Sequence, residues 1–387
     1  MPDFIPLSVP NISGKEWEYV RECLETGWVS SAGRYVVRFE EELARYVGAA
    51  HAIACVNGTA ALHTALLLAG VRPGDEVLAP SLTFIAPVNA VRYCGAEPVF
   101  FGADRYYNLD PVQAREFLGR ETERRGGETV DARTGRTIRA LLTVAVFGNA
   151  GDWAELYADC RARGIAVIED ATEALGTRYA AGPWAGRHAG TSADLACLSF
   201  NGNKIVTTGG GGMIVTDSEP LARRARYLTQ QAKDDPIAYV HDEIGFNYRL
   251  TNVAAAIGVA QLERIEEFAA RKQENYAAYR QRLAGLDWCE LRPAPDYARN
   301  NLWMYALCIK AGPWRDRARA LVDALQGHGI ETRPVWRPCH LQKPYRTFRT
   351  YGIEGTAELA ANTINLPCST HLEERQVARV CEVLARV

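Results

Sequence analysis

Apolar runs of strand length alternate with helical patterns from the N-terminal region as far as Thr216. Many of the runs are continuously apolar, which is typical of strands in a sheet that helices cover on both faces. The alternation of the two patterns indicates an α/β layer architecture. The predicted strands are Ala52–Val56, Glu76–Ala79, Glu97–Phe101, Ala140–Val146, Ala166–Glu169, Leu195–Ser199 and Gly212–Thr216.

Helical patterns lie on both sides of this region. Ser13-Gly14-Lys15-Glu16 has the spacing of a capping box and predicts a helix that runs to about Glu25. From Asn252 to Leu283, apolar positions recur at helical spacing, which predicts a long helical stretch that leads out of the large domain.

The remaining C-terminal sequence has a mixed pattern. It predicts a strand at Met304–Ile309, a helix near Ala318–Gly327 and a terminal helix from Glu373. Such a mixture is typical of a small α+β domain. We therefore expect a large domain over residues 1–255, and a linking helix with a small C-terminal domain over residues 256–387.

One polar segment, RETERRGGETVDARTGRTIR, interrupts the α/β pattern between Arg120 and Arg139. Its glutamates and its aspartate offset the arginines. The composition therefore favours a solvated hairpin or loop ahead of a strand over a basic binding surface.

The overall composition is that of an ordinary globular protein. Of the 387 residues, 48% are hydrophobic and 23% charged, and the formal net charge is -2. This balance gives no argument for binding to nucleic acid or to an anionic membrane. The N-terminus lacks a basic start followed by an apolar run, and apolar stretches such as Ala60–Ala69 are too short to span a bilayer. We expect a soluble, cytoplasmic protein.

The ten cysteines form no C-x-x-C pair. A chain of this length needs no disulfide framework, so the pattern favours a reducing compartment. Cys339 and His340 are adjacent, but without further ligands nearby they make a poor metal site. We expect no metal ion.

Asn57-Gly58-Thr59-Ala60 follows a predicted strand and opens a predicted helix. The free N–H groups of a helix start, beside a glycine that allows close approach, can bind a phosphate. An ordinary strand-to-helix turn with a Thr cap explains the same residues.

Asp170 ends the apolar run Ile165-Ala-Val-Ile-Glu-Asp. Ligands of α/β proteins gather at the carboxyl ends of strands, so a carboxylate here could keep a pyridinium nitrogen protonated. Alternatively, Asp170 caps a helix over Ala171–Leu175.

Lys204 lies in Ser199-Phe-Asn-Gly-Asn-Lys204, between two apolar strands and close to four consecutive glycines. A lone lysine is usually a solvated surface charge. In a short loop between buried strands, however, it can act as a nucleophile toward a carbonyl, with Ser199 as a hydroxyl donor to a phosphate. Phe84 and Trp28 could each offer a ring face to a ligand, or could be core aromatics.

The order of these features is specific. After the turn, the aromatic residue, the aspartate and the Ser–Lys pair comes Gly245-Phe-Asn-Tyr-Arg249. In this order the chain resembles the nucleotide-sugar aminotransferases of the DegT/DnrJ/EryC1/StrS family, from about Trp28 to Glu263 and more weakly to the C-terminus. The resemblance implies the type I fold of transferases that depend on pyridoxal 5'-phosphate (PLP). That fold has a large domain with a mostly parallel mixed sheet covered by helices, and a smaller α+β domain.

The resemblance also implies roles for individual residues. Lys204 would carry PLP covalently, Asp170 would pair with its ring nitrogen, and Phe84 would stack on its ring. The PLP phosphate would bind Gly58, Thr59 and Ser199.

Further positions follow from the same resemblance. Glu173 would face the cofactor hydroxyl, while Trp28 and His340 would lie near the nucleotide-sugar substrate. Asn247 would reach the cofactor phosphate of a partner subunit, which implies a homodimer with shared active sites. At Ala145, relatives often have a histidine, and this departure bears on the surroundings of the cofactor rather than on its contacts.

The implied reaction is a ping-pong transfer of an amino group from L-glutamate to a keto sugar. NKIVTTGGGG resembles the branch that aminates C4 of 4-keto-6-deoxy sugars, and FNGNKI together with the polar segment suggests UDP-4-keto-N-acetyl sugars. Alternatives are a C3-specific aminotransferase, a dehydratase of the same fold, in which a histidine replaces the lysine, and a regulator that only binds PLP or a sugar nucleotide.

Overall fold

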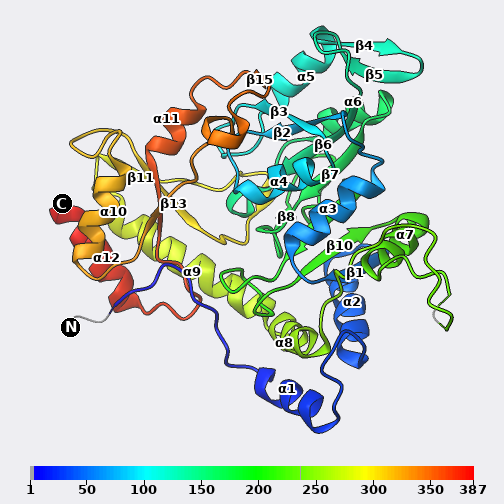
Figure 1. Cartoon of the computed structure of the whole chain (residues 1–387). Helices are drawn as coiled ribbons and strands as arrows, with labels where there is room; N and C mark the ends of the chain where they lie inside the picture. Colours follow the sequence, from blue (N-terminus) through cyan, green and yellow to red (C-terminus); the bar gives the residue numbers. More distant parts are fainter. Residues whose placement is uncertain (1–3, 236) are drawn as a thin grey trace.

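A computed structural model describes residues 4–235 and 237–387. Its largest feature is a sheet of eight strands near the middle of the molecule (Figure 1). In spatial order these are β1 (His51–Cys55), β10 (Gly212–Thr216), β9 (Leu195–Ser199), β7 (Ala166–Asp170), β6 (Ile138–Val144), β2 (Glu76–Pro80), β3 (Glu97–Phe101) and β15 (Thr350–Tyr351).

Most neighbours in this sheet are parallel. From β9 to β15 every pair is parallel, whereas β10 runs antiparallel to both β9 and β1. The predicted fold class, a mostly parallel mixed sheet covered by helices, is confirmed. Parallel strands end at the same edge, so the sheet brings the ends of β6, β7 and β9 together.

Helices cover both faces of the sheet because successive side chains of each strand point to opposite sides. On one face Ile53, Ile168 and Ile214 pack with α3 (Gly58–Leu68), α4 (Ile85–Tyr93) and α7 (Glu219–Thr229). The other face packs against α2 (Arg34–Val47) and α8 (Asn252–Leu262) at one end, and against α5 (Pro111–Arg120) and α6 (Ala154–Ala162) at the other.

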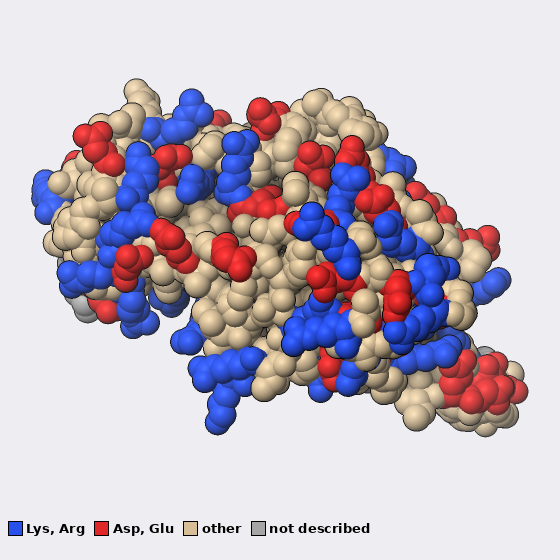
Figure 2. All heavy atoms as spheres, turned by 90° about the horizontal axis from the view of Figure 1, so that it is seen from above, with Lys and Arg blue, Asp and Glu red and all other residues tan. Residues whose placement is uncertain are grey.

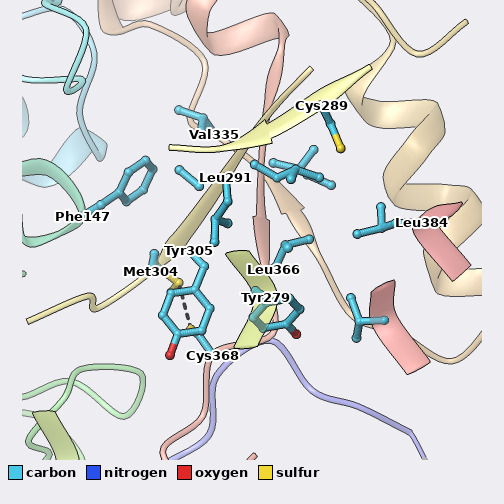
Figure 3. Close-up of a cluster of buried hydrophobic side chains, with 14 of the residues drawn as sticks. Phe147, Tyr279, Cys289, Leu291, Met304, Tyr305, Val335, Leu366, Cys368 and Leu384 are labelled. Atoms are coloured by element: carbon cyan, nitrogen blue, oxygen red, sulfur yellow. Dashed lines mark hydrogen bonds between the residues drawn. The ribbon is translucent and has the colours of Figure 1, made fainter. Parts of the chain in front are cut away.

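The C-terminal residues build a second, smaller core around a four-stranded antiparallel sheet. Its strands, in spatial order, are β11 (Cys289–Leu291), β13 (Tyr305–Ile309), β16 (Thr363–Leu366) and β14 (Arg333–Pro334). The helices α9 (Ile265–Leu283), α10 (Ala318–Gly327) and α12 (Glu374–Arg386) pack on it. Figure 3 shows Tyr279 of α9, Tyr305 of β13 and Leu384 of α12 converging in this core.

Several shorter elements complete the fold. They are α1 (Glu16–Glu25), the hairpin β4 (Thr122–Arg125) and β5 (Glu128–Asp131), the pair β8 (Arg178–Tyr179) and β12 (Ala298–Arg299), α11 (Thr356–Ala361), and the 3-10 turns η1 (Val146–Gly148), η2 (Cys339–Leu341) and η3 (Lys343–Tyr345). The hairpin confirms the prediction for the polar segment.

Two local predictions are wrong in detail. The hydroxyl of Ser13 donates to Asn11 rather than capping α1, and the Glu16 carboxylate accepts the N–H of Gly14 at 2.8 Å. The predicted helical stretch from Asn252 is two helices, α8 and α9, with a break at Glu263–Arg264. Amphipathic spacing survives a short break in a helix, so periodicity alone does not reveal it.

The division after residue 255 stays a prediction, and two segments lie across it. β15 comes from the C-terminal part yet extends the large sheet beside β3. Conversely, Ile5 near the N-terminus pairs with Ile330 and packs in the smaller core.

Acidic and basic side chains intermingle over most of the face shown in Figure 2. Within the described parts of the chain, no helix has both the length and the apolar content that a membrane crossing requires. All ten cysteines are buried and free.

Candidate active site

A cavity of about 360 Å³ lies where β6, β7 and β9 end and α3 begins. Seven of the ten residues predicted to form the site line it, namely Gly58, Thr59, Phe84, Asp170, Glu173, Ser199 and Lys204. They come from separate parts of the sequence, and the parallel strand ends bring them together. Trp303 and Trp336, from the C-terminal part of the chain, complete the wall.

The start of α3 forms one side of the cavity. Asn57, rather than a threonine, caps the helix, because its side chain accepts the N–H of Ala60 at 2.8 Å. Gly58 and Thr59 then occupy the first turn, where peptide N–H groups have no carbonyl partner within the helix. This leaves donors for an anion at the edge of the cavity.

Two glycines allow this helix start to lie against the strands. A Cβ atom on Gly58 would come within 3.0 Å of Cβ of Ser199 and 3.3 Å of Cγ2 of Thr172. A Cβ atom on Gly212 would come within 2.4 Å of the carbonyl oxygen of Asn57. A side chain at Gly212 would push the start of α3 away from β10, and one at Gly58 would press on Ser199 and Thr172.

Asp170 is the last residue of β7 and is only 3% exposed. Its carboxylate accepts the N–H of Thr172 at 3.0 Å, but turns rather than a helix follow it. The helix-cap interpretation is therefore wrong. Burial raises the pKa of Asp170, and this effect outweighs the hydrogen bonds from Thr172 and the positive charge of Lys204.

Lys204 and Glu173 form a buried ion pair in the cavity. Nζ of Lys204 lies 3.5 Å from Oε1 of Glu173, and their side chains are 12% and 4% exposed. The other Glu173 oxygen accepts the N–H of Phe147 at 2.8 Å. Burial raises the pKa of Glu173 to about 7, although the charge of Lys204 opposes this shift. Lys204 is thus not a solvated surface lysine.

The loop that carries Lys204 is fixed at both ends. The N–H of Lys204 donates to the carbonyl of Asn201 at 2.9 Å, and Phe200 pairs with Gly211 across the loop. Ser199 ends β9, and its Oγ accepts the N–H of Asn201 at 3.4 Å. These bonds fix the backbone of the segment that brings the amine and the hydroxyl to the cavity.

Phe84 stands at the mouth of the cavity. Its side chain is 52% exposed, and its ring centroid lies 6.3 Å from that of Trp336. It is therefore not a core aromatic. Ala145, by contrast, is buried, and its N–H donates to the carbonyl of Asp170 at 3.0 Å.

The remaining three predicted residues lie outside the described lining of this cavity. Trp28 is exposed and borders a separate surface cavity with Tyr35. Asn247 is exposed and pairs with Gln230. His340 is half-buried beside the hydroxyl of Ser81, and burial lowers its pKa. Within this single chain, the structure does not bring them to the site.

The two tryptophans were missed from the sequence. Trp303 precedes the predicted strand Met304–Ile309, and Trp336 follows the two-residue strand β14. A bulky aromatic residue beside a strand end is the one signal that could have marked them, and it is a weak one.

The cavity suits a phosphorylated pyridine aldehyde. It offers unpaired helix N–H groups and a hydroxyl for the phosphate, a buried carboxylate for a ring nitrogen, and an amine for the aldehyde carbon. A Cβ atom at Gly58 would fill the space beside Ser199, as expected for a phosphate cradle. Among the described residues, no three His, Cys, Asp or Glu side chains gather as metal ligands would.

Comparison with known proteins agrees with this geometry. The family model of the DegT/DnrJ/EryC1/StrS aminotransferases matches residues 10–385. The GDP-perosamine synthase of Caulobacter vibrioides is 40% identical, covering 99% of this chain and 98% of the relative. The GDP-perosamine synthase of Escherichia coli O157:H7 is 35% identical, covering 98% and 97%.

A solved structure gives the same result. The aminotransferase TlmJ from Streptoalloteichus hindustanus superposes with a TM-score of 0.87 at 28% identity, covering 99% of this chain and 100% of that one. The predicted resemblance is confirmed. The chain belongs to the DegT/DnrJ/EryC1/StrS aminotransferase family.

Proposed function

We propose that this protein is a PLP-dependent aminotransferase that transfers the amino group of L-glutamate to C4 of a nucleotide-linked 4-keto-6-deoxy sugar. The observation that carries the proposal is the position of Lys204, whose amine lies in the cavity 3.5 Å from Glu173. PLP is the cofactor of this family, and the described cavity offers a partner for each of its functional groups.

Different residues of the cavity would bind different groups of the cofactor. Gly58, Thr59 and Ser199 would hold the phosphate through two N–H groups and a hydroxyl. Asp170 would hold a proton on the ring nitrogen, since a buried carboxylate stabilises an adjacent positive charge. Phe84 would cover the ring.

When bound, the cofactor supplies an electron sink for negative charge that develops on the substrate carbon. Lys204 contributes the amine that binds the cofactor, and, once released, it accepts and returns the substrate proton at Nζ. Glu173 keeps that amine in place by accepting from it. Trp303 and Trp336, which form part of the cavity wall, would limit the access of water to the reacting carbon.

The choice of C4 rests on the resemblance of NKIVTTGGGG to C4-aminating relatives. For the nucleotide, the sequence alone suggests UDP-4-keto-N-acetyl sugars. The name of the two GDP-perosamine synthases denotes formation of a GDP-linked amino sugar and so favours GDP. We therefore propose a GDP-linked 4-keto-6-deoxy sugar as the acceptor.

We propose further that the active unit is a homodimer with shared sites. Asn247 lies outside the cavity of its own chain, just after a segment in which several apolar side chains face solvent. Ile237, Tyr239 and Ile244 are 89%, 71% and 86% exposed. Such a surface fits burial against a second copy, which would bring Asn247 to the partner's cofactor phosphate.

The assignment of Lys204 is tested by borohydride reduction of the protein with PLP, followed by peptide mapping. The pyridoxyl label should appear on Lys204, and Lys204→Ala should lose turnover. A label on another lysine would overturn the assignment.

The substrate is tested with a panel of GDP-, UDP- and dTDP-4-keto sugars plus glutamate, with NMR of the product. We expect an amine at C4 and a preference for GDP. An amine at C3, or no product from any 4-keto sugar, would contradict the proposal.

A further inference from the structure

One aromatic ring of the cavity faces Lys204 itself. Nζ of Lys204 lies 4.0 Å from the ring centroid of Trp303, on the face of the indole. Trp303 is only 3% exposed, although it comes from the C-terminal part of the chain. At this distance, and with both side chains largely buried, the electron-rich face of an indole attracts a positive charge.

The indole also holds the loop that carries the lysine. Its Nε1–H donates to the carbonyl of Asn203, the residue before Lys204, at 2.7 Å. Trp303 therefore contacts both the backbone and the amine of the same short loop. A phenylalanine at this position could make only the second contact.

Trp303 is in turn fixed by its own backbone. Its N–H donates to Oδ1 of Asn301 at 3.0 Å, and its carbonyl accepts from Nζ of Lys272 at 2.9 Å. Lys272 is a fully buried lysine on α9 that also donates to the carbonyl of Cys368 at 2.7 Å. These bonds fix the backbone from which the indole projects toward Lys204, while the bond to Asn203 holds the ring itself.

We propose that Trp303 is the positioning residue for Lys204, holding its loop and stabilising the positive charge that its amine acquires. The inference rests on the proposed function, in which Lys204 takes the substrate proton. The C–H bond of the substrate breaks, the proton joins Nζ, and the electron pair stays on the carbon that the cofactor stabilises. Positive charge then develops on Nζ between the Glu173 carboxylate and the Trp303 ring.

Hydrogen exchange of the cofactor-free protein tests the contact to the loop. Trp303→Phe keeps a ring face but loses the indole N–H, so the peptide N–H of Lys204 should exchange about 2- to 12-fold faster, the range for one hydrogen bond. Trp314→Phe is the matched control, because that indole also donates to a backbone carbonyl, of Val387 at 2.9 Å. Unchanged exchange in Trp303→Phe would refute this part of the proposal.

The contact to the amine is tested in the glutamate half-reaction. Trp303→Leu loses the ring face, and we expect this half-reaction to slow by roughly 5- to 30-fold, from the upper value for an exposed cation–π contact to that for a desolvated one. α-Deuterated glutamate should show a larger isotope effect in this variant than in the wild type, because proton transfer becomes more limiting. Trp303→Phe should keep most of the rate.

A double variant separates positioning from a merely structural role. Methylamine should partly restore the half-reaction of Lys204→Ala by entering the space that the side chain vacates. If Trp303 acts through Lys204, adding Trp303→Leu to this rescued protein should change its rate by less than about twofold, because the two effects are not additive. An equal loss in both backgrounds would overturn the proposal. If Lys204→Ala itself keeps full turnover without amine, the proposed function fails instead, whatever the exchange result.

Discussion

Glu169, next to the candidate catalytic Asp170, should make the stability of the protein depend on pH. Its side chain is completely buried in β7, where its Oε2 accepts from the hydroxyl of Tyr157 at 3.1 Å. Burial raises the pKa of Glu169 from 4.5 to about 7, although the hydrogen bond from Tyr157 acts in the opposite direction. Between pH 4.5 and about 7, Glu169 therefore keeps its proton in the folded protein but releases it in the unfolded chain.

The direction and the size of this pH dependence follow from the difference in proton binding between the folded and the unfolded protein. The contribution to stability is fully present below pH 4.5, and it is lost as the pH rises through about 7. This difference in the pKa of Glu169 between the folded and unfolded states corresponds to about 3 kcal/mol in the free energy of unfolding, since each pKa unit is worth about 1.4 kcal/mol. Between pH 5 and pH 8, Glu169 alone should lower the free energy of unfolding by roughly 2–3 kcal/mol.

Glu169→Gln removes the titrating group while keeping the shape of the side chain. Urea unfolding at one protein concentration, at pH 5 and at pH 8, should show a smaller loss of stability in this variant than in the wild type, by roughly 2–3 kcal/mol. The comparison uses the change with pH, so any constant cost of the amide cancels. Glu18→Gln, at an exposed position on α1, is the control and should behave like the wild type. If Glu169→Gln and the wild type lose the same stability, Glu169 is not buried as a neutral acid.

Three further predictions concern the site. Asp170→Asn should still bind PLP but turn over roughly 10- to 1000-fold more slowly, as the 1–3 pKa units of a paired charge imply, and near-normal turnover would refute the pairing. Gly58→Ala should weaken PLP binding in a fluorescence titration, because its Cβ would lie 3.0 Å from Ser199, and unchanged affinity would mean that the phosphate binds elsewhere. Lys204→Ala and Asn247→Asp should each be inactive, yet mixed dimers should regain up to about half the wild-type activity, because one of their two sites is intact. No recovery in heterodimers confirmed by native mass spectrometry would show that Asn247 does not serve the partner subunit.

Much of the large sheet could be predicted because its buried strands carry strong, continuous apolar signals. The site residues on those strands could be predicted for the same reason, since parallel strand ends meet at one edge. Asp170 and Ser199 end such strands, Lys204 lies in the loop that follows β9, and the roles proposed for all three come from the family resemblance. The two-residue strand β15 was missed because a segment so short carries no periodic pattern.

Contacts between distant parts of the chain could not be predicted from the sequence. Nothing in the local pattern around Trp303 indicates that its ring reaches Lys204, because tertiary packing alone brings them together. Similarly, Trp28, Asn247 and His340 follow family position rather than local chemistry, and within one chain they lie away from the cavity.

Because β15 pairs with β3, the nascent chain on the ribosome has an unpaired strand edge for part of its synthesis. The outer neighbour of β3 (Glu97–Phe101) is Thr350–Tyr351, which is synthesised long after β3 itself. At about 5–20 residues per second, the unpaired edge of β3 waits roughly 10–50 seconds for its partner. An open edge is a template for pairing with other chains, so the nascent polypeptide passes through a period in which it can associate wrongly. A chain truncated before Thr350 would make that period permanent, and it should need a chaperone to remain dispersed.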